Sequence, residues 1–127
     1  MAKKTSPTKP ATKVAKVALL AGPTIELISP TGLSMQTSGD TVSVLVKVTP
    51  EAGTTVQVNA DLTSSTVWTP PTTVNIGMNL PPIAVGSPYY LVSTTLATAG
   101  TSYVVRVTAV DSNGASMSVD AYFFTTN

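Results

Sequence analysis

Four valines at every second position constrain the fold of this chain more than any other feature. Val42, Val44, Val46 and Val48 lie within the segment 40–49 and alternate with mostly polar neighbours. Successive side chains of a β-strand point to opposite faces, so a period of two predicts a strand with one buried face. We therefore expect these four valines to be core residues.

Further short alternating segments surround this one, separated by Gly, Pro, Asn and Asp, which is the pattern of an all-β sandwich. The predicted strands span residues 24–29, 40–49, 55–60, 89–95, 102–110 and 115–125, with one more around Val74, Ile76 and Met78. The segment between residues 61 and 88 is harder to interpret because it holds five prolines, which are Pro70, Pro71, Pro81, Pro82 and Pro88. Proline cannot donate to a sheet ladder, so we expect edge segments and long loops there, with the strand order left open.

The composition restricts the chemistry that the chain can perform. It contains no cysteine, which excludes a thiolate metal site and a cysteine nucleophile, and no histidine, the commonest general base and zinc ligand. The six acids lie scattered, and a hydrolytic carboxylate pair such as Asp61 with Glu51 or Asp120 is a weaker interpretation than ordinary solvated positions. We expect no catalytic residue, no metal and no cofactor, and hence no enzyme.

Charge divides the chain into a basic arm (residues 1–22) and an acidic body (residues 23–127). Five lysines and no acid give the first sixteen residues a charge of +5: Lys3, Lys4, Lys9, Lys13 and Lys16. The remainder has one lysine and one arginine against six acids, or 2 − 6 = −4. Pro7 and Pro10 oppose a helix in the arm, which has too little apolar surface to order alone.

Three roles for the arm stay open. The lysines could attract it to an acidic protein surface, where Val17, Leu19 and Leu20 would become ordered against a neighbouring subunit. It could also be a solubilising tail. Nucleic acid is a third, weaker partner, because five lysines without interleaved aromatics attract phosphates only weakly. The apolar stretch 17–21 is too short for a signal peptide or a membrane span, so neither is expected.

Two stretches of the chain form recognisable sets. The first comprises Leu96, Gly100, Thr101, Tyr103, Arg106, Val107, Ala109, Val110, Asp111, Gly114 and Ser116. The second comprises Pro23, Ile25, Leu27, Ser29, Pro30, Gly39, Asp40, Thr41, Val42, Val44 and Val46. The first stretch resembles the last two strands, and the second the first strands, of fibronectin type III and bacterial immunoglobulin-like modules. The resemblance implies an all-β, immunoglobulin-like two-sheet sandwich. The chain departs from the pattern in lacking a tryptophan in the second strand.

The resemblance gives a role to one residue, and the local sequence gives a role to the turn that follows. Tyr103 takes the place of the corner tyrosine, whose hydroxyl bonds to upstream backbone. Asn113 and Gly114 form a hairpin turn after Asp111, since Asn-Gly supplies the positive φ angles of a tight turn. The same residues resemble a fragment of a calcium loop, but Tyr122 stands where the last ligand is needed.

Trp68, Tyr89 and Tyr90 are the candidate surface contacts. Trp68 lies close to two prolines, and the three rings could form an exposed platform for sugars or for a partner's groove. Alternatively, the only tryptophan of a small sandwich fills the core or covers an open end.

The expected function follows from the setting of such modules, which occur singly on phage capsids and tails and in tandem in bacterial surface proteins. One copy with its own Met1 favours a bacteriophage capsid decoration protein on the virion surface, with the arm on capsid subunits and the domain projecting outward. The alternative is a carbohydrate- or cell-surface-binding adhesion module of a phage tail or bacterial surface, with a host glycan as partner. A third hypothesis is a pilus or surface-layer subunit whose arm completes the next subunit's sheet. A homo-oligomer is compatible with all three, and no membrane partner is expected.

Overall fold

The computed structural model describes residues 22–126, which form eight strands and no helix. The arm residues that the sequence singles out, Lys3 to Leu20, lie outside the described residues. The strands are β1 (Thr24–Ser29), β2 (Leu33–Thr37), β3 (Asp40–Thr49), β4 (Val56–Ser65), β5 (Thr72–Gly77), β6 (Tyr89–Leu96), β7 (Ser102–Asp111) and β8 (Ser116–Thr126).

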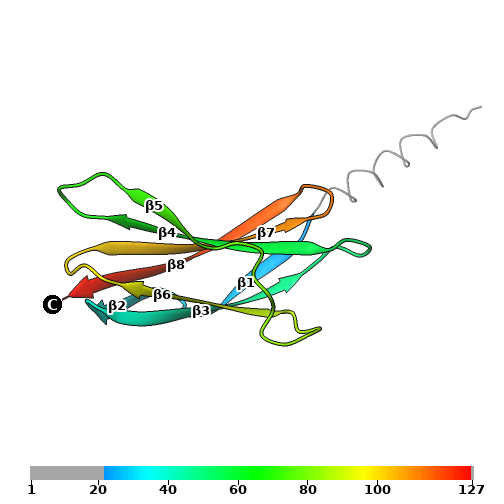
Figure 1. The fold of residues 1–127 in the computed structure, drawn as a ribbon, viewed down its shortest axis with the longest axis horizontal. Coiled ribbons are helices and arrows are strands. Elements are labelled where there is room, and N and C mark those ends of the chain that lie inside the picture. Colours follow the sequence, from blue (N-terminus) through cyan, green and yellow to red (C-terminus); the bar gives the residue numbers. More distant parts are fainter. Residues whose placement is uncertain (1–21, 127) are drawn as a thin grey trace, which may run out of the picture.

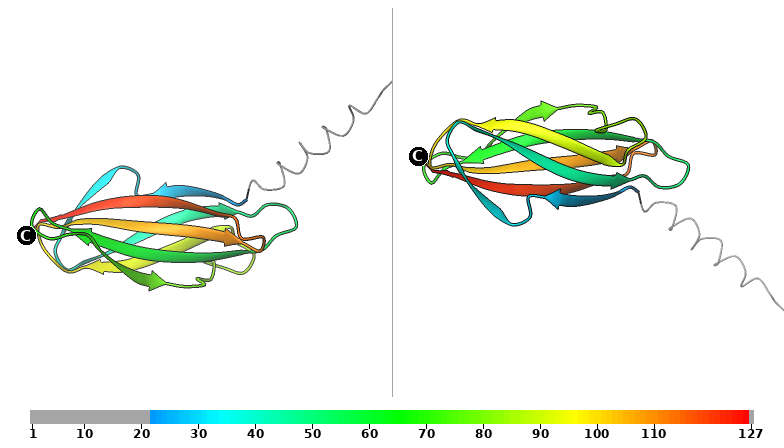
Figure 2. Two further views of the ribbon diagram at one scale, coloured as in Figure 1. Left: turned by 90° about the horizontal axis from the view of Figure 1, so that it is seen from above. Right: turned by 90° about the horizontal axis from the view of Figure 1, so that it is seen from below.

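The strands form two sheets packed face to face (Figures 1 and 2). One has three strands in the order β1-β3-β6, and the other has five in the order β2-β8-β7-β4-β5. β2 pairs in parallel with β8, and all other described pairs are antiparallel. The predicted all-β two-sheet sandwich is confirmed.

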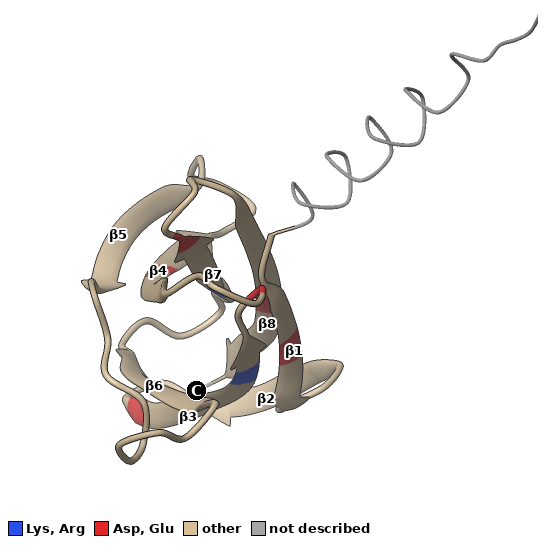
Figure 3. Cartoon of the chain, turned by 90° about the vertical axis from the view of Figure 1, so that its right-hand side faces the viewer, with Lys and Arg blue, Asp and Glu red and all other residues tan. Residues whose placement is uncertain are grey.

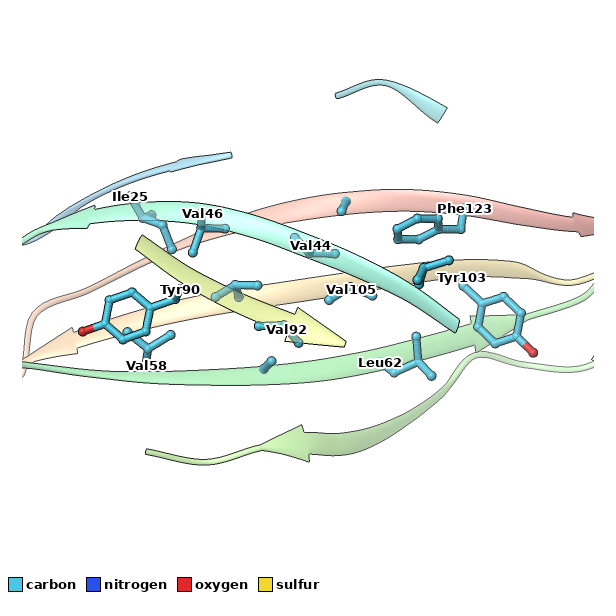
Figure 4. Close-up of a cluster of buried hydrophobic side chains, with 14 of the residues drawn as sticks. Ile25, Val44, Val46, Val58, Leu62, Tyr90, Val92, Tyr103, Val105 and Phe123 are labelled. Atoms are coloured by element: carbon cyan, nitrogen blue, oxygen red, sulfur yellow. The ribbon is translucent and has the colours of Figure 1, made fainter. Parts of the chain in front are cut away.

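The core lies between the sheets and is made of the inward residues of each strand (Figure 4). The four valines of β3 are all buried, as predicted. They face Val58 of β4, Val105 of β7 and Phe123 of β8, which are completely or almost completely inaccessible to solvent. Burying an aliphatic or aromatic side chain of this size contributes roughly 1.5–3 kcal/mol, so this layer dominates the stability of the sandwich.

The observed strands differ from the sequence prediction in two places. β4 continues to Ser65, five residues beyond the predicted strand, because its whole length pairs with β7 from Val56 to Ser65. β2 was not predicted at all. β5 lies at the edge of the sheet beside β4, which agrees with the expectation that the proline-rich segment supplies edge strands.

β2 and β5 are the two edge strands of the five-stranded sheet. Within residues 22–126, each pairs with a neighbour on one side only. Figure 1 shows that β2, the end of β8 and the β4–β5 hairpin all lie at the same end of the molecule.

Candidate functional site

One side of the sandwich is built from a segment without any charged residue. No Asp, Glu, Lys or Arg occurs between Asp61 and Arg106, a stretch of 106 − 61 − 1 = 44 residues. An average globular sequence is roughly 25% charged and would place about 11 charges there. The segment runs through the β4–β5 hairpin, β5, the connection 78–88 and β6, none of which carries a coloured residue in Figure 3.

This uncharged side is also where large apolar side chains are most exposed. They come from the hairpin, from β5, from the connection 78–88 and from β6, and comprise Val67, Trp68, Val74, Met78, Ile83, Val85 and Leu91. We call the exposed surface of these seven residues the uncharged side. Interface cores of protein complexes are likewise depleted of charges and enriched in aromatic residues and methionine.

Trp68 stands at the tip of the β4–β5 hairpin with 91% of its surface exposed. The tip is held by Thr66, whose Oγ1 accepts hydrogen bonds from the backbone N–H groups of Trp68 (3.2 Å) and Thr69 (3.1 Å). The hydroxyls of Thr66 and Thr69 are also 2.7 Å apart. Pro70 follows and restricts the backbone further. The exposed indole is therefore presented by a locally bonded turn.

The connection between β5 and β6 is tied to both sheets. Leu80 donates its backbone N–H to Val58 of β4 (2.8 Å), and Pro88 accepts from the backbone N–H of Val48 of β3 (2.8 Å). Leu80 also packs against the core. Val85, in contrast, is fully exposed. Apolar side chains here thus face solvent from an anchored backbone.

A hollow of about 260 Å³ lies beside the hairpin tip. Seven of its eight lining residues are Ser or Thr and the eighth is a tyrosine; they are Ser64, Ser65, Thr66, Thr69, Thr72, Thr98, Thr101 and Tyr103. The Tyr103 hydroxyl accepts a hydrogen bond from the backbone N–H of Thr98 (3.0 Å). The hollow is lined by hydroxyl-bearing side chains and carries no charge, so it continues the uncharged character of this side.

A second apolar surface lies at the opposite edge of the five-stranded sheet, on its outer face. We call it the β2 corner: Leu33 and Met35 of β2 beside Tyr122 and Phe124 of β8, which are their register partners. Leu33 and Met35 are 64% and 59% exposed, Tyr122 is 48% exposed, and Phe124 is half-buried.

The charges next to the β2 corner neutralise each other. Arg106 of β7 donates from Nε and Nη2 to the two carboxylate oxygens of Asp120 on β8, at 2.8 and 3.0 Å. This hydrogen-bonded pair, together with its opposite charges, raises the pKa of the Arg106 guanidinium above its usual value. The pair therefore presents little net charge to a molecule that approaches the corner.

The predicted aromatic platform does not form. Trp68 is exposed, so the alternative that it fills the core is wrong. Tyr90 is buried in the core, because it lies on the inward face of β6, and it cannot be a surface contact. Tyr89 is half-buried at the start of β6. The hairpin that carries Trp68 lies near the other end of that strand, because it lines the same hollow as Thr98, which follows β6. About seven residues at roughly 3.3 Å each separate the two ends.

The turn after β7 is held by its first residue. The carboxylate Oδ1 of Asp111 accepts hydrogen bonds from the backbone N–H groups of Asn113 and Ala115, both at 2.9 Å. Gly114 has a φ of 90°, which suits glycine. Asp111 thus serves the hairpin turn.

Sequence reasoning missed the residues of the β2 corner and most of the exposed apolar residues of the connection 78–88. The signal for the connection was present as the long run without charge. For β2 the signal was weak, since LSMQT is short and only Leu33 and Met35 alternate with polar residues.

The described residues contain no group of three or more His, Cys, Asp or Glu side chains that could hold a metal ion. In the part of the chain that the structure covers, no helix has the length and apolar character needed to cross a membrane.

No protein-family model matches this chain, and no curated protein matches it. Solved structures with the same fold do match. A variant of superoxide reductase (neelaredoxin) from Ignicoccus hospitalis is similar with a TM-score of 0.58 at 15% identity, over 96% of this chain and 99% of that one. The superoxide reductase of the same organism is similar with a TM-score of 0.53 at 16% identity, over 82% and 80% of the two chains. Spo0M, a sporulation control protein from Bacillus subtilis, has a TM-score of 0.52 at 11% identity, over 84% of this chain and 50% of that one.

These neighbours contradict two expectations from the sequence. The matching chains include superoxide reductases, which are enzymes, and none of those named above is a virion or adhesion protein. The expected capsid decoration protein, its adhesion-module alternative and the expectation of no enzyme are therefore wrong as inferences from this fold. At 15% identity the likeness establishes the fold alone and does not carry the reductase activity to this chain.

The residues of this chain do not fit a reductase-type metal centre. Iron in proteins is held mainly by histidine and cysteine, and the sequence contains neither.

Proposed function

We propose that this chain is a protein-binding domain that associates with its partner through the uncharged side. The observation that carries the proposal is the coincidence of 44 consecutive residues without charge and seven exposed large apolar side chains on the surface that they form. Exposed apolar patches of this kind mark interaction sites in soluble proteins.

Trp68 is the expected centre of the contact. Tryptophan is enriched among the residues that dominate binding energy, and its truncation commonly costs about 2 kcal/mol or more. The hydrogen bonds from Trp68 and Thr69 to Thr66 fix the tip before binding. Less conformational entropy is then lost when the partner binds.

The surroundings of Trp68 supply the rest of an interface. Val67 adds apolar area, and the hydroxyl-lined hollow offers neutral hydrogen-bonding groups beside it. A partner would bury no unpaired charge of this domain, which avoids the main desolvation cost of an interface.

Site-specific photocrosslinking in the cells that naturally make the protein tests the proposal. A photoreactive amino acid replaces Trp68 or Val85 on the uncharged side, and Gln57 or Ser118 on the outer face of the five-stranded sheet as matched exposed controls. We expect protein adducts from the first pair and few from the second. Equal adduct yields from all four positions, or none from Trp68 and Val85, would overturn the proposal.

A further inference from the structure

The five-stranded sheet carries an apolar surface at each of its two edges. The uncharged side includes the edge strand β5 and the hairpin tip with Trp68, and the β2 corner lies at the other edge. Two different surfaces at opposite edges of one sheet are the requirement for a head-to-tail contact between identical chains.

We propose that the partner of the uncharged side is a second copy of this chain, which docks with its β2 corner. In this contact β2 of one copy pairs with the first residues of β5 in the next, and Trp68 covers Met35 of the neighbour. The inference rests on the proposed function and names its partner.

Strand direction allows this pairing. β2 is parallel to β8, and each of the next three pairs, β8-β7, β7-β4 and β4-β5, is antiparallel. Three reversals make β5 run opposite to β2. A copy shifted sideways along the sheet therefore brings its β2 antiparallel to β5. The rows of the sheet join Leu33 to Thr73 and Ser34 to Thr72, so these two residues of β2 lie opposite the start of β5. The two edges then gain hydrogen bonds over these rows.

The register places Trp68 at the level of Met35. Met35 pairs with Phe124, Phe124 with Ser102, and Ser102 with Ser65, so these four residues form one row across the sheet. Trp68 follows Ser65 by three residues and stands just beyond that row. In a continued sheet the indole of one copy lies beside the exposed thioether of Met35 in the next, a favourable pairing of sulfur with an aromatic ring.

Charge also favours a second copy. The uncharged side has no group that could repel the β2 corner, and the Arg106–Asp120 pair beside that corner is internally neutralised. Asp40, the acid nearest to the end of β2, accepts the backbone N–H of Thr37 (3.0 Å). No unsatisfied charge would be buried in the contact.

Sedimentation velocity of purified full-length protein tests the inference with two variants. Trp68→Lys damages the uncharged side and keeps the β2 corner, whereas Met35→Lys does the reverse; both side chains are exposed, so both variants should fold. Gln57→Lys is the control, and thermal unfolding verifies the fold of each.

We expect the wild type and Gln57→Lys to form a concentration-dependent series of oligomers. Each of the two other variants alone should associate at least about 30-fold more weakly, which is the fold-change for loss of a hot-spot residue. Their equimolar mixture should form a 1:1 dimer that grows no further, because only one intact pair of surfaces remains.

Two outcomes would overturn the inference. Met35→Lys that dimerises alone would show that the uncharged side pairs with itself, which leaves the proposed function standing. Wild type that stays monomeric at every concentration would show that the second copy is not the partner, and the crosslinking experiment would then decide on the proposed function independently.

Discussion

Thr66 fixes the backbone of Trp68 by accepting its N–H at 3.2 Å through Oγ1. This bond joins a half-buried hydroxyl to the most exposed aromatic ring of the described chain. The Thr66 turn therefore both orders the backbone of the hairpin tip and holds the indole in its exposed position. A binding surface of this type should depend on Thr66 even though Thr66 need not touch the partner.

Thr66→Val should weaken association several-fold and change stability little. Valine keeps the shape of the side chain but cannot accept the two backbone N–H groups, so the tip becomes mobile and loses entropy on binding. Sedimentation measures the association, and Thr108→Val is the control, since it breaks the exposed Thr108–Ser118 hydroxyl contact of 2.8 Å on the sheet's outer face. Equal association by wild type and Thr66→Val would contradict the role of the turn.

Leu96→Ala and Leu91→Ala should differ strongly although both lie on β6. Leu96 is fully buried and Leu91 is 50% exposed. Truncation of a buried leucine costs about 2–5 kcal/mol, whereas a surface change stays within about 0.5 kcal/mol. Urea denaturation measures both, and similar losses would contradict the inward and outward faces assigned to β6.

Tyr103→Phe should lower the free energy of unfolding by about 1 kcal/mol, because it removes the hydroxyl that accepts the N–H of Thr98. Tyr122→Phe is the matched control, since Tyr122 is 48% exposed and water can replace its bonds. Chemical denaturation compares the two. A loss confined to Tyr122→Phe would show that the Tyr103 tie is unimportant.

Asp111→Ala should destabilise the β7–β8 hairpin by about 1 kcal/mol, and Asp111→Asn by less. Alanine leaves the N–H groups of Asn113 and Ala115 without their acceptor, while asparagine retains an oxygen in the same place. Thermal unfolding ranks the three proteins. Equal stability of Asp111→Ala and wild type would argue that the turn is held by its Asn-Gly backbone alone.

Much of the fold was predictable because it is encoded by short-range periodicity. The alternating valines of β3 point inward as expected, and the ends of β1 and β3 agree with the predicted ones. β2 was not predictable in this way. Its five residues gain their conformation from pairing with β8, whose register partners lie 89 residues further along the chain, which is a tertiary effect.

The candidate site was predictable only in part. Trp68 was recognised as a contact residue, but its exposure depends on how the hairpin tip bonds to itself through Thr66, which sequence patterns do not reveal. In sequence Tyr90 appeared equivalent to Tyr89. The alternation of side chains along β6 places Tyr90 on the inward face, where it joins the core. The β2 corner exists only because β2 pairs with β8, so no local sequence pattern predicts it.

The central claim is that the uncharged side is a binding surface, and the mass of the native assembly tests it most directly. The protein would be measured by size-exclusion chromatography of gently lysed source cells, with wild type, Trp68→Lys and Gln57→Lys compared. We predict that wild type and Gln57→Lys elute well above the 13.0 kDa of one chain, and that Trp68→Lys elutes at the monomer position. Wild type at the monomer position, or Trp68→Lys in an assembly of unchanged size, would contradict the account.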